Sequence, residues 1–180
     1  MTGDVPPATT VTEGFRVAMR GLAKGVVIIS TRGSDGRHAM AATAVTSLSF
    51  DPPSMLICVN QNASIFAALI GGSGFYVNIL SRTDQDMAGL CSGKLKGEAR
   101  FGSKRWTEDE TAWPYLTDAQ AAVRCVTERG FLRYGTHGIF IGRVTDVRTV
   151  GDIDPLIYVD GRYSGLPQEA NLPCSGTESA

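Results

Sequence analysis

Small side chains that can form hydrogen bonds are concentrated between His38 and Ser64. The hydroxyl residues in the first half of this stretch lie among alanines, and they are Thr43, Thr46, Ser47 and Ser49. Such a segment lets a flat ligand approach the backbone closely, while hydroxyls and backbone amides supply hydrogen bonds. The same residues also suit the solvent-facing side of a strand, so the pattern alone leaves both interpretations open.

Two glycine-containing segments begin or end like nucleotide-binding motifs but have the wrong spacing. Gly93-Lys94 ends like a phosphate loop, yet Leu95 stands where that motif needs serine or threonine. Gly72-Ser73-Gly74 begins like a dinucleotide fingerprint, yet Val77 stands where the third glycine is due. Neither segment predicts a nucleotide site by itself.

The tripeptide Asn62-Ala63-Ser64 matches the acceptor pattern for N-glycosylation. The segment from Met1 to Gly14 has no basic region followed by an apolar run, so we expect no secretion signal. The tripeptide is therefore either incidental or serves another purpose.

Cysteines and histidines do not form a metal-ligand pattern in this chain. The cysteines are widely spaced and only two histidines could join them: Cys58, Cys91, Cys125, Cys174, His38 and His137. Zinc sites need closer pairs, so we expect no metal. No serine or cysteine stands in a credible catalytic triad either.

Overall composition narrows the function classes further. Lys and Arg number 17 against 18 Asp and Glu, so a net charge of −1 gives no field for holding nucleic acid. No apolar run approaches the ~18 residues of a membrane span. We therefore expect a cytoplasmic protein with reduced thiols and no nucleic-acid or membrane partner.

The elements that must position these residues follow from periodicity. Apolar residues with helical spacing between Phe15 and Ala23 predict an amphipathic helix that begins at Thr12 or Glu13 and ends before Gly25. We expect this helix to pack one face on a sheet. Further short helices are expected at 64–70 and 84–91.

Short apolar and β-branched segments predict at least six strands. They lie at 26–31, 37–49, 55–59 and 75–80, in two or three segments within 120–148, and at 156–159. A turn at 33–36 and the Pro52-Pro53 pair separate the first of them. The pattern favours a mainly β fold, a closed or partly open antiparallel barrel with a few short helices.

The two ends of the chain differ in composition from the rest. Residues 1–11 and 167–180 are rich in Pro, Ser, Thr and Gly, which predicts a flexible N-terminus and a flexible C-terminal tail. The folded body is expected at 12–166, as one domain.

This body resembles the short-chain flavin reductases, the reductase components of two-component flavin-dependent aromatic monooxygenases. The resemblance runs from Phe15 to Tyr163 and rests on motifs in the family's order. They are Met40-Ala41-Ala42-Thr43-Ala44, Asp51-Pro52-Pro53, Cys58-Val59-Asn60, Asn62-x-Ser64, Val77-Asn78-Ile79-Leu80, Arg100-Phe101, Trp106, Gly135-Thr136-His137 and Pro155-Leu156-Ile157-Tyr158. The resemblance implies an FMN-binding split β-barrel of Greek-key type that dimerises and reduces flavin with NADH or NADPH.

The resemblance also assigns cofactor-binding residues, one position at a time. The strand Ala42, Thr43, Ala44, Thr46 and Ser47 is implied to meet the isoalloxazine edge and the ribityl chain. The loop Asn60, Gln61, Asn62 and Ser64, opening a helix, is implied to receive the flavin phosphate. Arg100 and Phe101 are implied to lie near the phosphate and the ring. Tyr163 is also expected to bind the cofactor.

His137 matches the histidine that lies beside the nicotinamide in this family, and it is the predicted catalytic residue. A lone histidine in a glycine-rich turn is otherwise more often structural. Many family members carry aspartate before this histidine, whereas Thr136 stands there in this chain.

The implied reaction is hydride transfer from NADH to FAD or FMN, after which reduced flavin leaves for a partner oxygenase with a phenolic substrate. FAD is favoured because reductases of phenol hydroxylases often use it, and NADH because no basic cluster lies near Gly135. The alternatives are a split-barrel oxidoreductase with tightly bound flavin and another acceptor, such as a corrinoid or an azo compound, and a non-catalytic flavin- or haem-binding module.

A homodimer is also expected. A small split barrel would leave Val, Ile and Phe of the 139–147 segment in water unless a second copy covers them.

Overall fold

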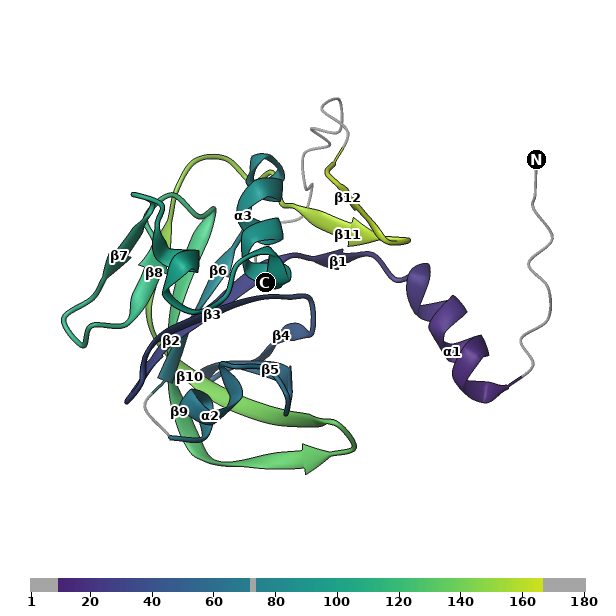
Figure 1. Cartoon of the computed structure of the whole chain (residues 1–180), viewed down its shortest axis with the longest axis horizontal. Helices are drawn as coiled ribbons and strands as arrows, with labels where there is room; N and C mark the ends of the chain where they lie inside the picture. The colour runs from purple at the N-terminus through teal and green to yellow at the C-terminus, as the bar shows by residue number, and fades with distance from the viewer. Residues whose placement is uncertain (1–9, 72–73, 167–180) are drawn as a thin grey trace, which may run out of the picture.

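The computed structural model of the chain describes residues 10–71 and 74–166. Its main element is a seven-stranded antiparallel sheet with the strand order β3-β2-β6-β9-β10-β5-β4 (Figure 1). The strands are β2 (Val27–Gly33), β3 (Gly36–Ala42), β4 (Val45–Phe50), β5 (Pro53–Asn60), β6 (Gly74–Ile79), β9 (Ala121–Tyr134) and β10 (His137–Thr149). The expectation of a mainly β fold is confirmed.

The two edge strands of this sheet are consecutive in the sequence. β3 and β4 stand at opposite ends of the strand order, yet only Thr43 and Ala44 connect them. The sheet must therefore curl until its edges approach each other, which makes a barrel with an unpaired seam. The predicted single strand at 37–49 is thus wrong, because the chain crosses the seam at Thr43 and Ala44.

Smaller elements extend this barrel. A three-stranded sheet combines β1 (Lys24–Gly25), β11 (Ile157–Val159) and β12 (Arg162–Ser164), and a hairpin combines β7 (Trp106–Glu108) and β8 (Pro114–Leu116). The short helices are α2 (Phe66–Ile70), η1 (Arg82–Asp84), α3 (Gln85–Gly89), η2 (Leu90–Lys94) and η3 (Gly97–Phe101). The helix expected at 84–91 is a succession of 3-10, α and π turns, and the segment 120–148 forms two long strands.

Alternate residues of β2 enter two different cores, which explains its continuous apolar sequence. Val27 and Ile29 face the barrel interior, where Cys125 is fully buried. Ile28 faces a second core under the short helices, where Cys91 is 2% exposed. Both faces of this part of the sheet are therefore covered by the chain itself.

The first helix departs from the prediction. α1 (Val11–Arg20) begins one residue after Thr10, whose side chain accepts a hydrogen bond from the Glu13 amide, and it ends at Gly21. None of its residues is buried, and the helix projects away from the barrel (Figure 1). The expectation that it packs on a sheet of its own chain is wrong. Thr10 and Val11 also fall within the predicted flexible end, whereas residues 1–9 and 167–180 lie outside the described residues.

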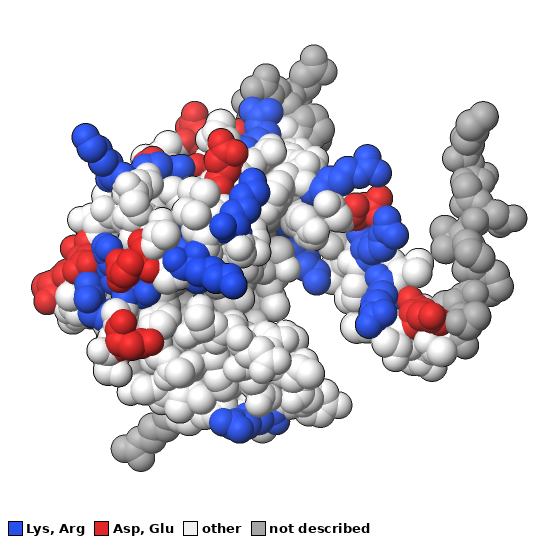
Figure 2. All heavy atoms as spheres, in the orientation of Figure 1, with Lys and Arg blue, Asp and Glu red and all other residues white. Residues whose placement is uncertain are grey.

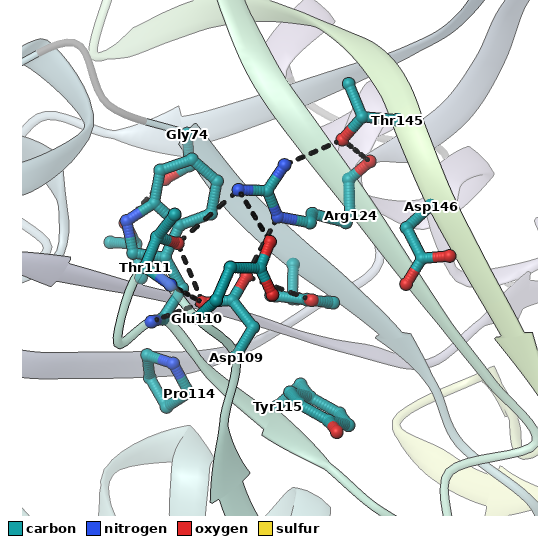
Figure 3. Close-up of polar contacts among 12 residues, drawn as sticks. Gly74, Asp109, Glu110, Thr111, Pro114, Tyr115, Arg124, Thr145 and Asp146 are labelled. Carbon is teal, nitrogen blue, oxygen red and sulfur yellow. Dashed lines mark hydrogen bonds and ion pairs between the residues drawn. The ribbon is translucent and has the colours of Figure 1, made fainter.

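A buried ion pair fastens the β7–β8 hairpin to β9 (Figure 3). The Asp109 carboxylate lies 2.8 Å from Arg124 Nε and also accepts hydrogen bonds from Thr111, Tyr76 and the Trp113 amide. Burial by itself would raise the pKa of Asp109, but the hydrogen bonds from Thr111 and Arg124 prevail and lower this pKa to about 2. The carboxylate is therefore charged at neutral pH and holds the hairpin in place.

Candidate flavin site

The seam between β3 and β4 carries the small residues that the sequence singled out. A cavity of 440 Å³ beside it is lined by Ala41, Ala42, Thr43, Tyr163 and other residues of the β3, η2 and β11–β12 segments. Alanine side chains leave the backbone accessible, so a planar ring can lie against this surface. Three of the predicted cofactor-binding residues thus share one cavity: Ala42, Thr43 and Tyr163.

A second cavity of 750 Å³ lies against β4 and β5. Its lining includes the remaining predicted strand residues Ala44, Thr46 and Ser47. Ala44 is tied to β5 because its carbonyl accepts a hydrogen bond from the Cys58 amide at 2.9 Å. The predicted strand therefore divides its residues between two cavities, with Thr43 lining both.

Arg100 is anchored on β3 and on the segment before η3, and it is not among the residues that line the first cavity. Its Nη1 donates to the Ala39 carbonyl at 2.6 Å and its Nε donates to the Leu95 carbonyl at 2.9 Å. The same Nη1 lies 3.4 Å from the Ser64 hydroxyl. The fold thus brings Arg100 and Ser64, which are 36 residues apart, together as donors suited to a phosphate.

The loop after β5 uses several of its polar groups internally. The Asn60 side chain accepts from the Asn62 amide at 2.9 Å. The Gln61 amide group donates to the carbonyls of Gly135 and, at 3.5 Å, His137. The helix α2 begins only at Phe66 and has five residues, so its dipole contributes little to holding an anion. The phosphate role of Asn60, Gln61 and Asn62 stays a prediction.

Phe101 has a clear structural role. Its ring is 6% exposed and packs on Trp106 at 4.8 Å between centroids. The Arg37 guanidinium lies 4.5 Å over the Phe101 ring and is fixed by Glu98 at 2.5 Å. The predicted contact of Phe101 with the cofactor has no support in this packing and stays a prediction.

His137 is the first residue of β10 and pairs with Asn60 of β5. Its side chain is exposed beside the loop that also carries Ser64. The strands β5 and β10 therefore place the predicted nicotinamide-side residue next to the predicted phosphate loop.

Two cavity residues were missed by the sequence reasoning, namely Ser92 and Tyr158. Ser92 lies in η2, a π turn whose irregular backbone produces no apolar period to read. Tyr158 belongs to a predicted strand and to the last motif of the resemblance, which gives it no role in binding, and its ring packs on Tyr163 at 5.5 Å.

Charges on the molecule are mixed. Lys and Arg alternate with Asp and Glu over the face drawn in Figure 2, while its lower part is largely uncharged. The described residues contain no cluster of three metal-ligating side chains and no helix long and apolar enough to span a membrane.

Comparison with known proteins gives matches over most of the chain. The flavin reductase like domain matches residues 19–167. FMN reductase (NADH) RutF of Pseudomonas syringae pv. syringae (strain B728a) is 37% identical over 92% of this chain and 92% of that protein. The reductase component of FADH(2)-dependent resorcinol hydroxylase of Rhizobium sp. (strain MTP-10005) is 34% identical over 84% of this chain and 85% of its own.

A solved structure is also similar to this chain. BorF, the flavin reductase component of a bacterial two-component tryptophan halogenase, superposes with a TM-score of 0.78 and 29% identity. The match covers 87% of this chain and 98% of BorF. The split-barrel topology is therefore shared over almost the whole described body.

Proposed function

Because this chain belongs to the flavin reductase like domain family and is an NADH-dependent flavin reductase, we propose that its reduced flavin serves an oxygenase that acts on a phenolic substrate. The observation that carries this proposal is the likeness to the reductase component of a resorcinol hydroxylase over most of both chains. Use of NADH fits the expected cytoplasmic location.

When bound, the nicotinamide supplies a hydride and the flavin accepts it. The residues of this chain have to hold the two rings together, because hydride transfer needs close and aligned partners. The seam alanines leave room for a ring, and Arg100 and Ser64 offer donors to a phosphate. His137 is proposed to contact the nicotinamide side. No general base is required for this reaction.

Steady-state turnover tests the function. We expect NADH oxidation to rise with added free flavin and to saturate, with reduced flavin released into solution under anaerobic conditions. The four pairs of FMN or FAD with NADH or NADPH should be compared, since the preference for FAD stays a prediction and relatives are named for both flavins. Oxidation of NADH that is independent of added flavin, with flavin retained by the protein, would favour the alternative oxidoreductase. A Soret band would indicate haem.

We further propose that the protein is a homodimer whose interface includes α1. The apolar side of α1 is exposed in the single chain, with Val11 92% and Phe15 62% exposed. Leu132 and Tyr134 are also exposed in the β9–β10 hairpin, at 62% and 80%. Monomeric proteins rarely leave such apolar surface uncovered. Within 139–147, Phe140 is buried in the chain's own core, whereas Ile141 and Val147 are 38% and 52% exposed, so only part of that segment is left for a second copy to cover.

Sedimentation equilibrium is expected to give twice the chain mass of 19.1 kDa at micromolar concentration. Phe15→Arg should shift the equilibrium toward monomer because it places a charge in the proposed interface. Ile153→Arg, at an apolar residue that is 84% exposed in a loop, serves as the matched control and should leave the mass unchanged. A wild-type mass near that of one chain would contradict the dimer.

A further inference from the structure

The backbone around His137 is fixed by a residue from a different part of the chain. Gly135 and Thr136 form the two-residue turn between β9 and β10, with Tyr134 and His137 paired across it. The Gln61 amide N donates to the Thr136 carbonyl at 2.9 Å, and the Gln61 side chain donates to the Gly135 carbonyl at 3.0 Å. The turn is therefore held against the loop after β5. With the backbone fixed, the His137 imidazole can move only by rotation about its side-chain bonds.

One hydrogen bond sets those torsions. Thr136 Oγ1 lies 2.9 Å from His137 Nδ1. Within the described residues, neither of these two side chains makes another hydrogen bond. Threonine is β-branched and has few rotamers, so its hydroxyl is a well-defined partner. The ring nitrogen that carries the proton is determined by the bond that the other nitrogen makes.

The chemistry of residue 136 limits which neutral form of the imidazole it can bind at Nδ1. A carboxylate at this position can only accept, which requires the proton on Nδ1. A hydroxyl can accept from an Nδ1–H group or donate to a bare Nδ1, and only the second arrangement leaves the proton on Nε2. The carboxamide oxygen of a nicotinamide and the carbonyl oxygens of an oxidised flavin are acceptors, and an Nε2–H group suits them.

We propose that Thr136 is a positioning residue whose hydroxyl donates to His137 Nδ1, so that the neutral imidazole presents its Nε2–H to the bound ligands. This role rests on the proposed function of His137. It assigns to this chain a histidine tautomer opposite to the neutral one that an aspartate would hold.

Nitrogen-15 NMR of the two histidines tests the tautomer directly, at an alkaline pH above which their ring nitrogen shifts no longer change. His38 is an internal reference, because its Nε2 lies 2.8 Å from the Asp35 carboxylate. We expect the proton of wild-type His137 on Nε2. Thr136→Ser should preserve this state, Thr136→Val should give the tautomer mixture of a free imidazole, and Thr136→Asp should move the proton to Nδ1. A proton on Nδ1 in the wild type, or equal mixtures in the wild type and Thr136→Val, would overturn the proposal.

Stopped-flow reduction of flavin under anaerobic conditions tests the consequence for catalysis. Loss of one hydrogen bond of this kind in Thr136→Val should slow reduction at saturating NADH by roughly 2- to 10-fold, and Thr136→Ser should restore it. His137→Ala should slow it by roughly 10- to 100-fold. In the His137→Ala background, Thr136→Val should have no further effect. A slowing that persists there would overturn the positioning role, whereas a wild type that does not oxidise NADH with flavin would contradict the proposed function and leave the NMR result intact.

Discussion

Replacement of Arg100 by lysine is expected to weaken FMN binding by about 3 kcal/mol, roughly 150-fold in affinity. Nη1 and Nε of Arg100 are anchored on the carbonyls of Ala39 and Leu95. In the described part of the chain no hydrogen bond is recorded for Nη2, so this group is available to a phosphate oxygen. A lysine has a single nitrogen, which cannot anchor on both carbonyls and bind the phosphate in a fixed geometry. Calorimetric titration with FMN gives the dissociation constant.

Riboflavin provides the matched control for this prediction, since it has the same ring but no phosphate. We expect its affinity to be nearly the same for the wild type and Arg100→Lys. Ser64→Ala should weaken FMN binding by about 10-fold, again without affecting riboflavin. The two effects should be less than additive in the double variant, because both groups address one phosphate. Equal losses for FMN and riboflavin would show that Arg100 acts only on the fold around Ala39 and Leu95.

Replacement of Asp109 by alanine is expected to lower the free energy of unfolding by about 3–5 kcal/mol. The Asp109 side chain is fully buried and that of Arg124 is 15% exposed, so the variant leaves a largely buried guanidinium without its carboxylate. Chemical denaturation at pH 7 measures the difference. Glu128→Ala is the control, because the Glu128–Arg143 pair is about half exposed and its loss should cost less than about 1 kcal/mol. A loss below about 1 kcal/mol in Asp109→Ala would contradict this role.

The same carboxylate predicts a pH dependence of stability. The pKa of Asp109 is lowered from 3.8 to about 2 in the folded chain, so its ionisation stabilises the fold at any pH above the unfolded value of 3.8. This contribution, about 2 kcal/mol, is lost as the pH falls from 3.8 through about 2. The difference in the free energy of unfolding between the wild type and Asp109→Asn should therefore become smaller as the pH falls over that interval. Above about pH 5 this difference should stay constant.

Local patterns predicted most strands because short β-branched segments bounded by turn residues strongly favour the extended conformation. The position of the seam could not be read in this way. Residues 37–49 look like one strand, and the break at Thr43 and Ala44 depends on pairing with β2 on one side and β5 on the other. The exposure of α1 was equally out of reach, because its amphipathic period requires a partner surface but does not say which chain supplies it.

In the candidate site, too, some features were predictable from the sequence and others depend on contacts between distant residues. Arg100 and Ser64 were each identified through the family resemblance, and the structure adds that they meet at 3.4 Å. No sequence pattern pointed to Ser92, because the π turn that carries it has no regular apolar spacing. The use of Gln61 as a clamp on the turn before His137 depends on contacts between residues 74 or more positions apart, which no short motif encodes.

The burial of two cysteines has a consequence for the chemical durability of this enzyme. Reduced flavin that meets dioxygen in solution yields peroxide, so the protein works beside a source of oxidant. Peroxide attacks thiolates rather than thiols. Burial raises the pKa of Cys91 to about 11 and that of Cys125 to about 12, so both sulfurs remain protonated at neutral pH and enclosed by the two cores. The fold thereby keeps these two sulfur atoms out of reach of a by-product of its own reaction.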